Sequence, residues 1–324
     1  MPTIEEIRRI PKVELHAHLN GSISVKTMRR LAGNETVDNL VIKQATTMEE
    51  VFKLFPLVQK LTSNKENLTI ATEEVLEEFA DDGVIYLELR TTPKRTESMC
   101  EEEYVKTVID CLKRKQQTIV TKLILSIDRR MTLEQAGKVV NMAVNDESGF
   151  IVGIDLSGDP SLDGTKFIPY LQRARDTGLG IAVHLAEIKS NLAEVTQFLD
   201  FGPDRIGHGT FLHTSQQFVD QVVAKRIPLE VCLTSNVMCK TTRTVKDSHF
   251  MFWRNKDVIV CVCTDDKGLM TDCSLSSEMK KASDTFGLSL VELKTIAKKS
   301  FDVSFGKKKL PKNVVDEIEK GFFE

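Results

Sequence analysis

The sequence predicts an α/β protein whose single domain is an eight-stranded (β/α)8 barrel. Eight short runs rich in valine, isoleucine and leucine recur along the chain, and stretches with helical spacing separate them. Nearly continuous apolar runs are typical of parallel strands that are covered on both faces. A chain of 324 residues suits such a barrel, which commonly takes roughly 250 residues or more. Because no internal repeat or linker-like stretch interrupts the pattern, we expect residues 1–324 to form one domain.

The expected strands follow one another with helical pattern between them. They cover residues 13–18, 85–90, 123–128, 152–156, 181–184, 205–208, 229–233 and 258–264. Between the first two strands, residues 23–82 hold about three expected helices where one would suffice. This helical insertion is well placed to cover an active site, so we expect it to serve as a lid.

Capping signals mark where several helices begin and end. Thr47 opens a capping box, and apolar residues follow it at helical spacing over residues 51–61. A second apolar stripe over residues 68–79 is expected to end at Gly83, which can adopt the left-handed conformation of a helix cap. Thr132 is expected to open a further helix by the same capping pattern.

Composition excludes several classes of protein. The formal charge of −3 and the pI near 6.1 provide no basic footprint for nucleic acid. The charged N-terminus lacks the apolar core of a signal peptide, and no apolar run approaches the roughly 18 residues of a membrane span. Seven irregularly spaced cysteines fit reduced thiols, with Cys261 and Cys263 expected as buried packing residues. We expect a cytoplasmic enzyme, monomeric, without nucleic-acid or membrane partners.

Ionisable residues stand at the ends of several expected strands, and together they predict a metal site. His16 and His18 are two residues apart, so their side chains point to the same face of a strand. His184 and Asp265 follow later apolar runs, and active sites of such barrels lie at these strand ends. Three neutral imidazoles and one carboxylate suit Zn²⁺. We therefore predict one zinc ion per chain, bound by these four residues. A single strand-end histidine is more often structural, but the combined set argues against that alternative.

Three further residues are candidates for acid–base chemistry. Glu187 leaves its strand shortly after a predicted ligand, where a carboxyl group could donate and accept protons. His208 and Asp266 would flank a hydroxide on the metal, although Asp266 could instead cap a helix or support a ligand. His213 and His249 follow no strand end, so we expect them to be surface or packing residues.

The motifs around these residues resemble those of the adenosine/AMP deaminase family and occur in the family's order. They cover residues 13–22, 155–159, 184–187, 205–209 and 264–266. Residues 89–95 and 233–236 are most similar to the adenosine deaminase-like branch, the N6-methyl-AMP deaminases. The resemblance implies a (β/α)8 barrel with one zinc ion that hydrolytically deaminates C6 of a purine. The Pro-Cys-x-x-Cys signature of cytidine-type zinc deaminases does not occur in this sequence.

The resemblance also implies a role for each residue. Glu187 would protonate N1 of the purine, and His208 would help to deprotonate the metal-bound water. Asp266 would hold the resulting hydroxide, while the backbone of Gly158 would meet the far edge of the base. Asp128 would contact the ribose. The full set of expected substrate contacts is His18, Asn20, Gln59, Thr91, Thr92, Pro93, Lys94, Asp128, Gly158, Glu187 and Asp266.

The residues near the expected ribose favour a nucleoside monophosphate over a free nucleoside. Asn20 stands where adenosine deaminases typically have an aspartate, which would repel phosphate. Thr91, Thr92 and Lys94 supply two hydroxyl groups and a cation at the end of the second strand. Lys94 could alternatively belong to a solvated loop. Gln59 replaces a histidine of related proteins, so its contact with the ligand is open. The resemblance alone, and no single residue, implies that the expected reaction converts N6-methyl-AMP to IMP and methylamine.

Three other functions remain open on the sequence. The chain could deaminate the free nucleoside, or it could be a nucleotide-binding barrel without activity. Binuclear amidohydrolases share the opening His-x-His, but they commonly use a modified lysine at the end of the fourth strand. Here that strand leads into residues 156–159, which contain no lysine.

Overall fold

Eight parallel strands follow one another around the barrel in the order in which they occur in the chain. The structure is a computed structural model that describes residues 1–33 and 37–323. Within these residues each strand is hydrogen-bonded to the next, which confirms the predicted fold class. The strands are β1 (Lys12–His18), β2 (Val84–Thr91), β3 (Val120–Asp128), β4 (Ile151–Ser157), β5 (Gly180–Leu185), β6 (Arg205–His208), β7 (Leu229–Val231) and β8 (Val260–Val262).

The barrel closes where the last strand meets the first. Ala17 forms a parallel bridge with Asp265, which follows β8. The backbone N–H of Asp265 donates to the carbonyl of His16 at 2.8 Å, and the N–H of His18 donates to the carbonyl of Asp265 at 3.2 Å. The residues that close the barrel are therefore among those that the sequence marks as metal ligands.

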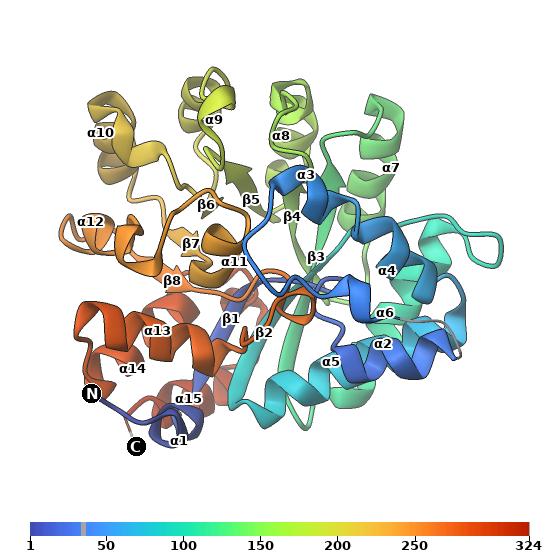
Figure 1. Cartoon of the computed structure of the whole chain (residues 1–324). Helices are drawn as coiled ribbons and strands as arrows, with labels where there is room; N and C mark the ends of the chain where they lie inside the picture. The colour runs from blue at the N-terminus through green and yellow to red at the C-terminus, as the bar shows by residue number, and fades with distance from the viewer. Residues whose placement is uncertain (34–36, 324) are drawn as a thin grey trace.

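Helices surround the strands and cover the outer face of the sheet (Figure 1). The apolar strand residues are buried, as expected of strands covered on both faces, and several strands also carry buried polar residues such as Glu14, Arg90 and Glu230. Outside the β1–β2 segment, the helices are α1 (Ile4–Arg9), α6 (Glu101–Lys115), α7 (Leu133–Val144), α8 (Ile168–Asp176), α9 (Val195–Phe201), α10 (Gln216–Lys225), α11 (Leu233–Met238), α12 (Phe250–Arg254), α13 (Leu275–Phe286), α14 (Leu290–Asp302) and α15 (Lys312–Gly321). Thr132 caps α7 through a capping box, as predicted.

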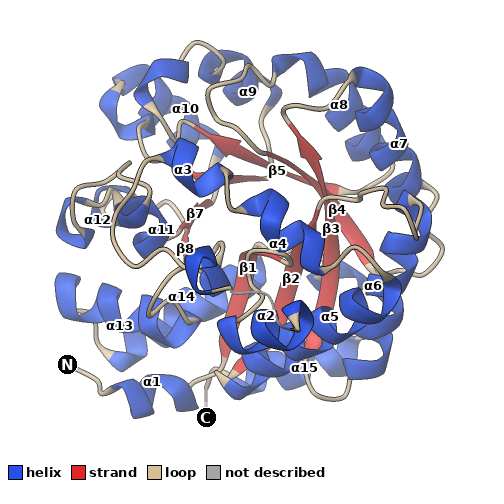
Figure 2. Cartoon of the chain, turned by 45° about the vertical axis from the view of Figure 1, so that its right-hand side comes forward, coloured by secondary structure: helices blue, strands red, loops and turns tan. Residues whose placement is uncertain are grey.

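The segment between β1 and β2 is helical and reaches over the barrel. In its described part the α-helices are α2 (Val25–Ala32), α3 (Met48–Phe52), α4 (Phe55–Leu61) and α5 (Lys65–Asp81). Figure 2 shows α3 and α4 in front of the ring of strands. Side chains of both helices line the cavity at the carboxyl ends of the strands, so this segment forms part of the cavity wall.

The start of the insertion follows the capping signals, but one expected helix is divided. Thr47 caps α3 through a capping box with Glu50, as predicted. The continuous helix expected over residues 51–61 is wrong, because α3 ends at Phe52 and α4 begins at Phe55 with Pro56 in its first turn. Proline lacks a backbone N–H and clashes with a preceding turn, so it starts a helix more easily than it continues one. Gly83 follows α5 with a φ of 79°, in the left-handed conformation expected of it.

The last two strands are shorter than predicted. The run over residues 229–233 was expected to be a strand throughout, but β7 ends at Val231 and α11 begins at Leu233. This early turn places Ser235 and Asn236 of α11 beside the candidate site.

Cys261 and Cys263 are fully buried, as predicted. Among the described residues, none of the helices combines the length and apolar character needed to cross a membrane.

Candidate metal centre and active site

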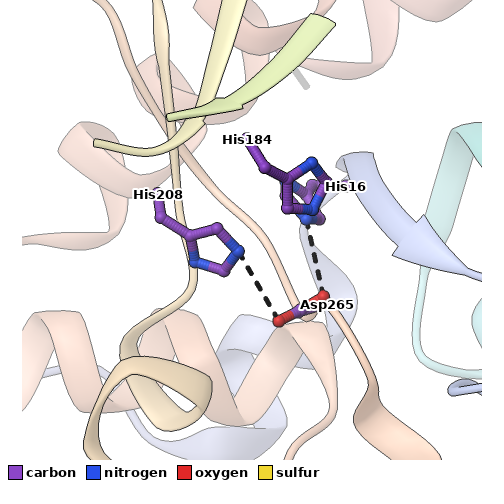
Figure 3. Close-up of side chains that lie close together, drawn as sticks. All are labelled: His16, His184, His208 and Asp265. Atoms are coloured by element: carbon purple, nitrogen blue, oxygen red, sulfur yellow. Dashed lines mark ion pairs between the residues drawn. The ribbon is translucent and has the colours of Figure 1, made fainter. Parts of the chain in front are cut away.

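The side chains that the sequence places at strand ends converge at the carboxyl end of the barrel. His16 lies in β1, His184 lies in β5, His208 ends β6 and Asp265 follows β8. Ligand atoms of these four residues all lie within 4.8 Å of one another. Figure 3 shows the four side chains gathered around one centre. Such a group can hold a metal ion.

His18 belongs to a second group of the same kind, with Asp155 and His184. The Nε2 atom of His18 lies 3.2 Å from Nε2 of His184 and 3.5 Å from Oδ1 of Asp265. The Nε2 atom of His16 lies 3.5 Å from the same oxygen. Ligands of one tetrahedral zinc ion, each about 2.0–2.1 Å from the metal, are about 3.3–3.5 Å apart. These three distances are close to that range, although the group of four whose ligand atoms lie mutually within 4.8 Å contains His208 in place of His18.

Two further properties of the histidines fit a cation at this point. The Nε2 atom of His16 is buried and has no hydrogen-bond partner among the described residues. A buried polar atom without a partner is costly, and a metal ion would satisfy it. Burial lowers the pKa of His18 to about 3, so this imidazole is neutral and free to bind a metal.

Buried carboxylates hold two of the imidazoles from behind. Oε2 of Glu230 lies 2.9 Å from Nδ1 of His16, and Oδ1 of Asp155 lies 3.0 Å from Nδ1 of His184. Arg90 joins the two carboxylates, with one guanidinium nitrogen 2.9 Å from Asp155 and another paired with Glu230. Carboxylates that accept the Nδ1–H leave Nε2 as the metal-binding atom and orient the ring. This arrangement presents both Nε2 atoms toward the same centre.

His208 is held in a similar way but lies slightly further from the centre. Its Nδ1 is 3.0 Å from Oδ1 of Asn236, an acceptor that selects the tautomer with a free Nε2. That Nε2 lies 3.6 Å from Oε2 of Glu187 and 3.8 Å from Oδ2 of Asp265. Burial lowers the pKa of His208, which favours the neutral ring. Nε2 of His208 is thus a proton acceptor that lies between Asp265, a possible metal ligand, and Glu187, a possible acid.

Asp265 and Asp266 are adjacent and buried, but their pKa values shift in opposite directions. Burial opposes ionisation of Asp265, yet His16 and the other imidazoles hold its pKa well below the usual range. Burial and the negative charge of Asp265 raise the pKa of Asp266 well above its usual range. Asp266 makes no capping hydrogen bond to the helical turn that follows, and its Oδ1 has no partner among the described residues. The capping alternative for Asp266 is therefore wrong.

The backbone is strained at three of these strand ends. Ala186, His208 and Asp265 have φ values of 53°, 58° and 59°, in the left-handed region that non-glycine residues seldom adopt. Each such residue costs about 1–3 kcal/mol, and strain of this kind gathers at functional sites. The turn at Ala186 carries Glu187 from the end of β5 toward His208.

One cavity contains these groups and most of the expected substrate contacts. Its walls come from strand ends, from the lid helices α3 and α4, and from α11. The residues that line it include His18, Asn20, Gly21, Met48, Val51, Phe52, Phe55, Gln59, Thr91, Thr92, Asp128, Arg130, Gly158, Glu187, His208, Ser235, Asp265 and Asp266. Pro93 and Lys94, which the sequence also suggested, are absent from this lining.

Lys94 does not line the cavity, and its side chain links α4 to the segment that follows β2. Its Nζ donates to the carbonyl of Gln59 at 2.6 Å and to Oγ1 of Thr62 at 2.9 Å. Thr62 in turn donates to Oδ1 of Asn20 at 2.9 Å. No carboxylate pairs with this ammonium among the described residues, and burial lowers the pKa of Lys94 to about 8. Arg95, by contrast, is largely exposed and pairs with Glu101.

The cavity wall also contains a cation, Arg130, that is not among the expected substrate contacts. Arg130 lines the cavity and pairs with Asp128, whose Oδ1 accepts a hydrogen bond from its Nε at 2.8 Å. The guanidinium also lies 5.9 Å from the centre of the Phe52 ring in α3. Asp128 is thus already paired with Arg130, and a ribose hydroxyl that donates to Asp128 would have to share the carboxylate with that guanidinium.

Comparison with known proteins places these features in one family. A family model described as "Adenosine deaminase" matches residues 11–321. The chain is 41% identical over 301 residues to the "Adenosine deaminase-like protein" of Caenorhabditis elegans, covering 89% of this chain and 77% of that protein. It is 38% identical over 317 residues to the "N6-Methyl-AMP deaminase" of Homo sapiens, covering 91% and 89% of the two chains. The solved structure of the "ADAL-IMP complex" has a TM-score of 0.90 at 37% identity, covering 99% and 98%. The chain therefore belongs to the adenosine deaminase family.

Proposed function

We propose that this protein is a zinc-dependent aminohydrolase that converts N6-methyl-AMP and water to IMP and methylamine. The observation that carries the proposal is the convergence of His16, His18, His184 and Asp265 at the carboxyl end of the barrel, with Nε2 of His16 and of His18 each 3.5 Å from one oxygen of Asp265, beside Glu187. The human relative is named N6-Methyl-AMP deaminase, and the similar solved structure is a complex with IMP, the expected product.

We propose one zinc ion per chain, bound by those three imidazoles and by the carboxylate of Asp265. His208 is left out because its Nε2 lies 3.8 Å from Asp265, further than His16 or His18. When bound, zinc would lower the pKa of a coordinated water toward about 7 and so supply a nucleophile at neutral pH. Ser235 donates to Oδ2 of Asp265 at 2.7 Å, which leaves Oδ1 to face the ion.

Three residues would move or hold protons around the purine. Glu187, whose Oε1 is buried without a partner, would donate a proton to N1 and make C6 electrophilic. The free Nε2 of His208 would accept a proton from the attacking water. Oδ1 of Asp266, also without a partner, would accept a hydrogen bond from that water and orient it toward C6. The C6–N bond then breaks, methylamine leaves with a proton, and a carbonyl remains on C6.

The far side of the cavity would hold the rest of the nucleotide. Gly158 has a φ of 96°, and a side chain there would collide with Asp128, so its bare backbone can approach the base edge. Asp128 would contact the ribose, and Gln59 would close over the ligand from α4. His18 and Thr91 line the same cavity and complete the proposed contacts there.

The phosphate would lie toward Asn20, Thr92 and Lys94, with Pro93 shaping the turn between them. Lys94 is a partly buried cation without a carboxylate partner, and such a group is stabilised by an anion. The ammonium does not line the cavity, so contact with phosphate requires it to exchange its bond to Gln59 or Thr62. This requirement makes Lys94 both a phosphate contact and a link to the lid.

We also propose that residues 1–324 act as one hydrolase domain and as a cytoplasmic monomer, with a small nucleotide as ligand. The family match over residues 11–321 supports a single unit. The net charge of −3 favours a small ligand over nucleic acid.

The proposed substrate is tested by comparing turnover of N6-methyl-AMP, AMP and the two corresponding nucleosides. We expect one methylamine per IMP formed and a kcat/KM at least about 10-fold higher for the nucleotides than for the nucleosides, since a phosphate contact contributes at least one charge-assisted hydrogen bond. Equal values for nucleotide and nucleoside would contradict the phosphate assignment, and no turnover of any of the four would contradict the proposed reaction.

A further inference from the structure

Two histidines outside the site form a stacked pair behind β6. The rings of His213 and His249 are 6.0 Å apart between centroids and only 6° from parallel. His249 is 3% exposed and stands immediately before α12, which packs against β8. Its Nε2 lies 2.8 Å from the backbone carbonyl oxygen of His208. One member of the pair therefore contacts the backbone of a candidate catalytic residue, whereas His213 makes no such contact within the described part of the chain.

The carbonyl of His208 needs a hydrogen-bond partner outside the sheet because His208 still pairs with β5 but no longer with β7. The pairing of β6 with β7 extends through Ile206 and Gly207 and goes no further. At His208 the φ angle is 58°, and Gly209 continues in the left-handed region at 63°. The carbonyl of His208 thus turns away from the neighbouring strand, and a buried carbonyl must find another donor. The ring of His249 supplies that donor.

The chemistry of His249 suits a permanent donor. Burial lowers its pKa to about 3, so the ring is neutral and carries a single N–H. The Nδ1 atom has no partner among the described residues, whereas Nε2 faces the carbonyl. The N–H therefore lies on Nε2, and its position is fixed by the stack with His213.

We propose that His249 is a positioning residue that holds the strained backbone of His208 and thereby aims its imidazole. Two contacts then define the ring: Asn236 at Nδ1 and His249 at the backbone carbonyl. Together they direct Nε2 toward Glu187, which lies 3.6 Å away. The kinetic part of this inference rests on the proposed aminohydrolase function, whereas the structural part does not.

The test compares variants that separate the donor from the ring. His249→Phe keeps an aromatic ring for the stack but has no N–H. His249→Gln loses the ring but restores an N–H donor, and His249→Met matches glutamine in shape without a donor. His213→Phe is the control, because it alters the other ring of the stack. Each protein is measured for zinc content, melting temperature, kcat and KM, with kcat expressed per bound zinc.

We expect His249→Phe and His249→Met to lower kcat per zinc by about 10- to 100-fold with little change in KM, because small misplacements of a catalytic group cost up to about 10² in rate. His249→Gln should recover most of that loss, and His213→Phe should stay within about twofold of the original protein. Equal losses in His249→Gln and His249→Met, or an unchanged kcat per zinc in both, would overturn the proposal. This matched pair decides the question if His249→Phe does not fold.

A structural readout keeps the inference distinct from the proposed reaction. In a crystal structure of His249→Met we expect the His208 imidazole to move away from Glu187, and in His249→Gln to return. A superimposable His208 in both variants would overturn the positioning role even if the enzyme acts on another substrate. Absence of turnover in the unmodified protein would contradict the proposed function alone, since the position of His208 can still be compared.

Discussion

The Nε2 atoms of His18 and His184 lie 3.2 Å apart, although 166 residues separate the two histidines in the chain. Two neutral imidazole nitrogens at this distance repel unless a proton or a cation lies between them. His18 resists protonation, since burial lowers its pKa to about 3. A metal ion shared by the two Nε2 lone pairs is consistent with this contact.

Metal removal should abolish activity and lower stability. A chelator that strips the proposed zinc ion leaves buried imidazoles and carboxylates without their common partner. At a free zinc concentration 100 times the Kd, binding adds about 2.7 kcal/mol of stability. We expect the melting temperature to fall on chelation and to recover, with activity, on addition of zinc but not magnesium, which prefers oxygen ligands. His184→Ala should remain metal-free and inactive after zinc addition, and full zinc occupancy in that variant would contradict its role as a ligand.

Replacing Glu187 should separate chemistry from binding. Glu187→Gln keeps the size of the side chain but removes the proton that N1 of the purine would receive. We expect kcat to fall by about 10² or more. Zinc content and the Kd for IMP should remain close to those of the original protein. Loss of zinc in this variant would instead indicate that Glu187 is a metal ligand.

Replacing Gly21 with alanine should lower the reaction rate, because the added methyl group would displace the carboxyl group of Asp266. A Cβ atom at this position would lie 1.6 Å from Oδ1 of Asp266, so the carboxyl group must move. Because displacement of a catalytic group by about 1 Å can cost about 10² in rate, we expect a loss of that size for Gly21→Ala. Zinc binding should persist. Gly137→Ala, in α7 on the outside of the barrel, serves as the control, and an equal loss there would point to a general effect on folding.

The pH dependence of kcat/KM for the nucleotide should reveal the loss of positive charge on Lys94. Burial lowers the pKa of this ammonium to about 8, so its charge is present below pH 8 and is lost as the pH rises through that value. The phosphate of a nucleotide is already fully ionised there, with a second pKa near about 6. We expect kcat/KM for N6-methyl-AMP to fall above about pH 8, whereas the value for the nucleoside stays level. Lys94→Met should lower the nucleotide value and remove this difference, and an unchanged profile would exclude Lys94 from phosphate binding.

The convergence of the candidate metal-binding residues could be predicted because strand ends of a parallel barrel meet at one edge. His16, His18, His184 and Asp265 each follow a recognisable apolar run, and their order along the chain is enough to bring them together. The partners behind the ligands were missed. Glu230 lies inside the apolar run of β7. An acidic residue in such a run was the signal that could have indicated a buried partner for a histidine.

Other features depend on tertiary packing that periodicity does not encode. Asn236 was singled out only as part of the motif over residues 233–236. Its contact with His208 arises because β7 ends early and α11 follows. Lys94 was expected at the cavity surface, but its side chain folds back to the carbonyl at Gln59. His249 was expected to be a packing or surface residue, since its hydrogen bond to His208 joins segments 41 residues apart. Sequence spacing alone does not indicate contacts of this kind.

Anomalous diffraction at the zinc absorption edge, from crystals grown with zinc, would locate the metal without reference to the substrate. We expect one peak per chain, within about 2.0–2.2 Å of Nε2 of His16, His18 and His184 and of one oxygen of Asp265. Two peaks in the cavity, or a single peak bound by His208 in place of His18, would contradict the proposed mononuclear centre.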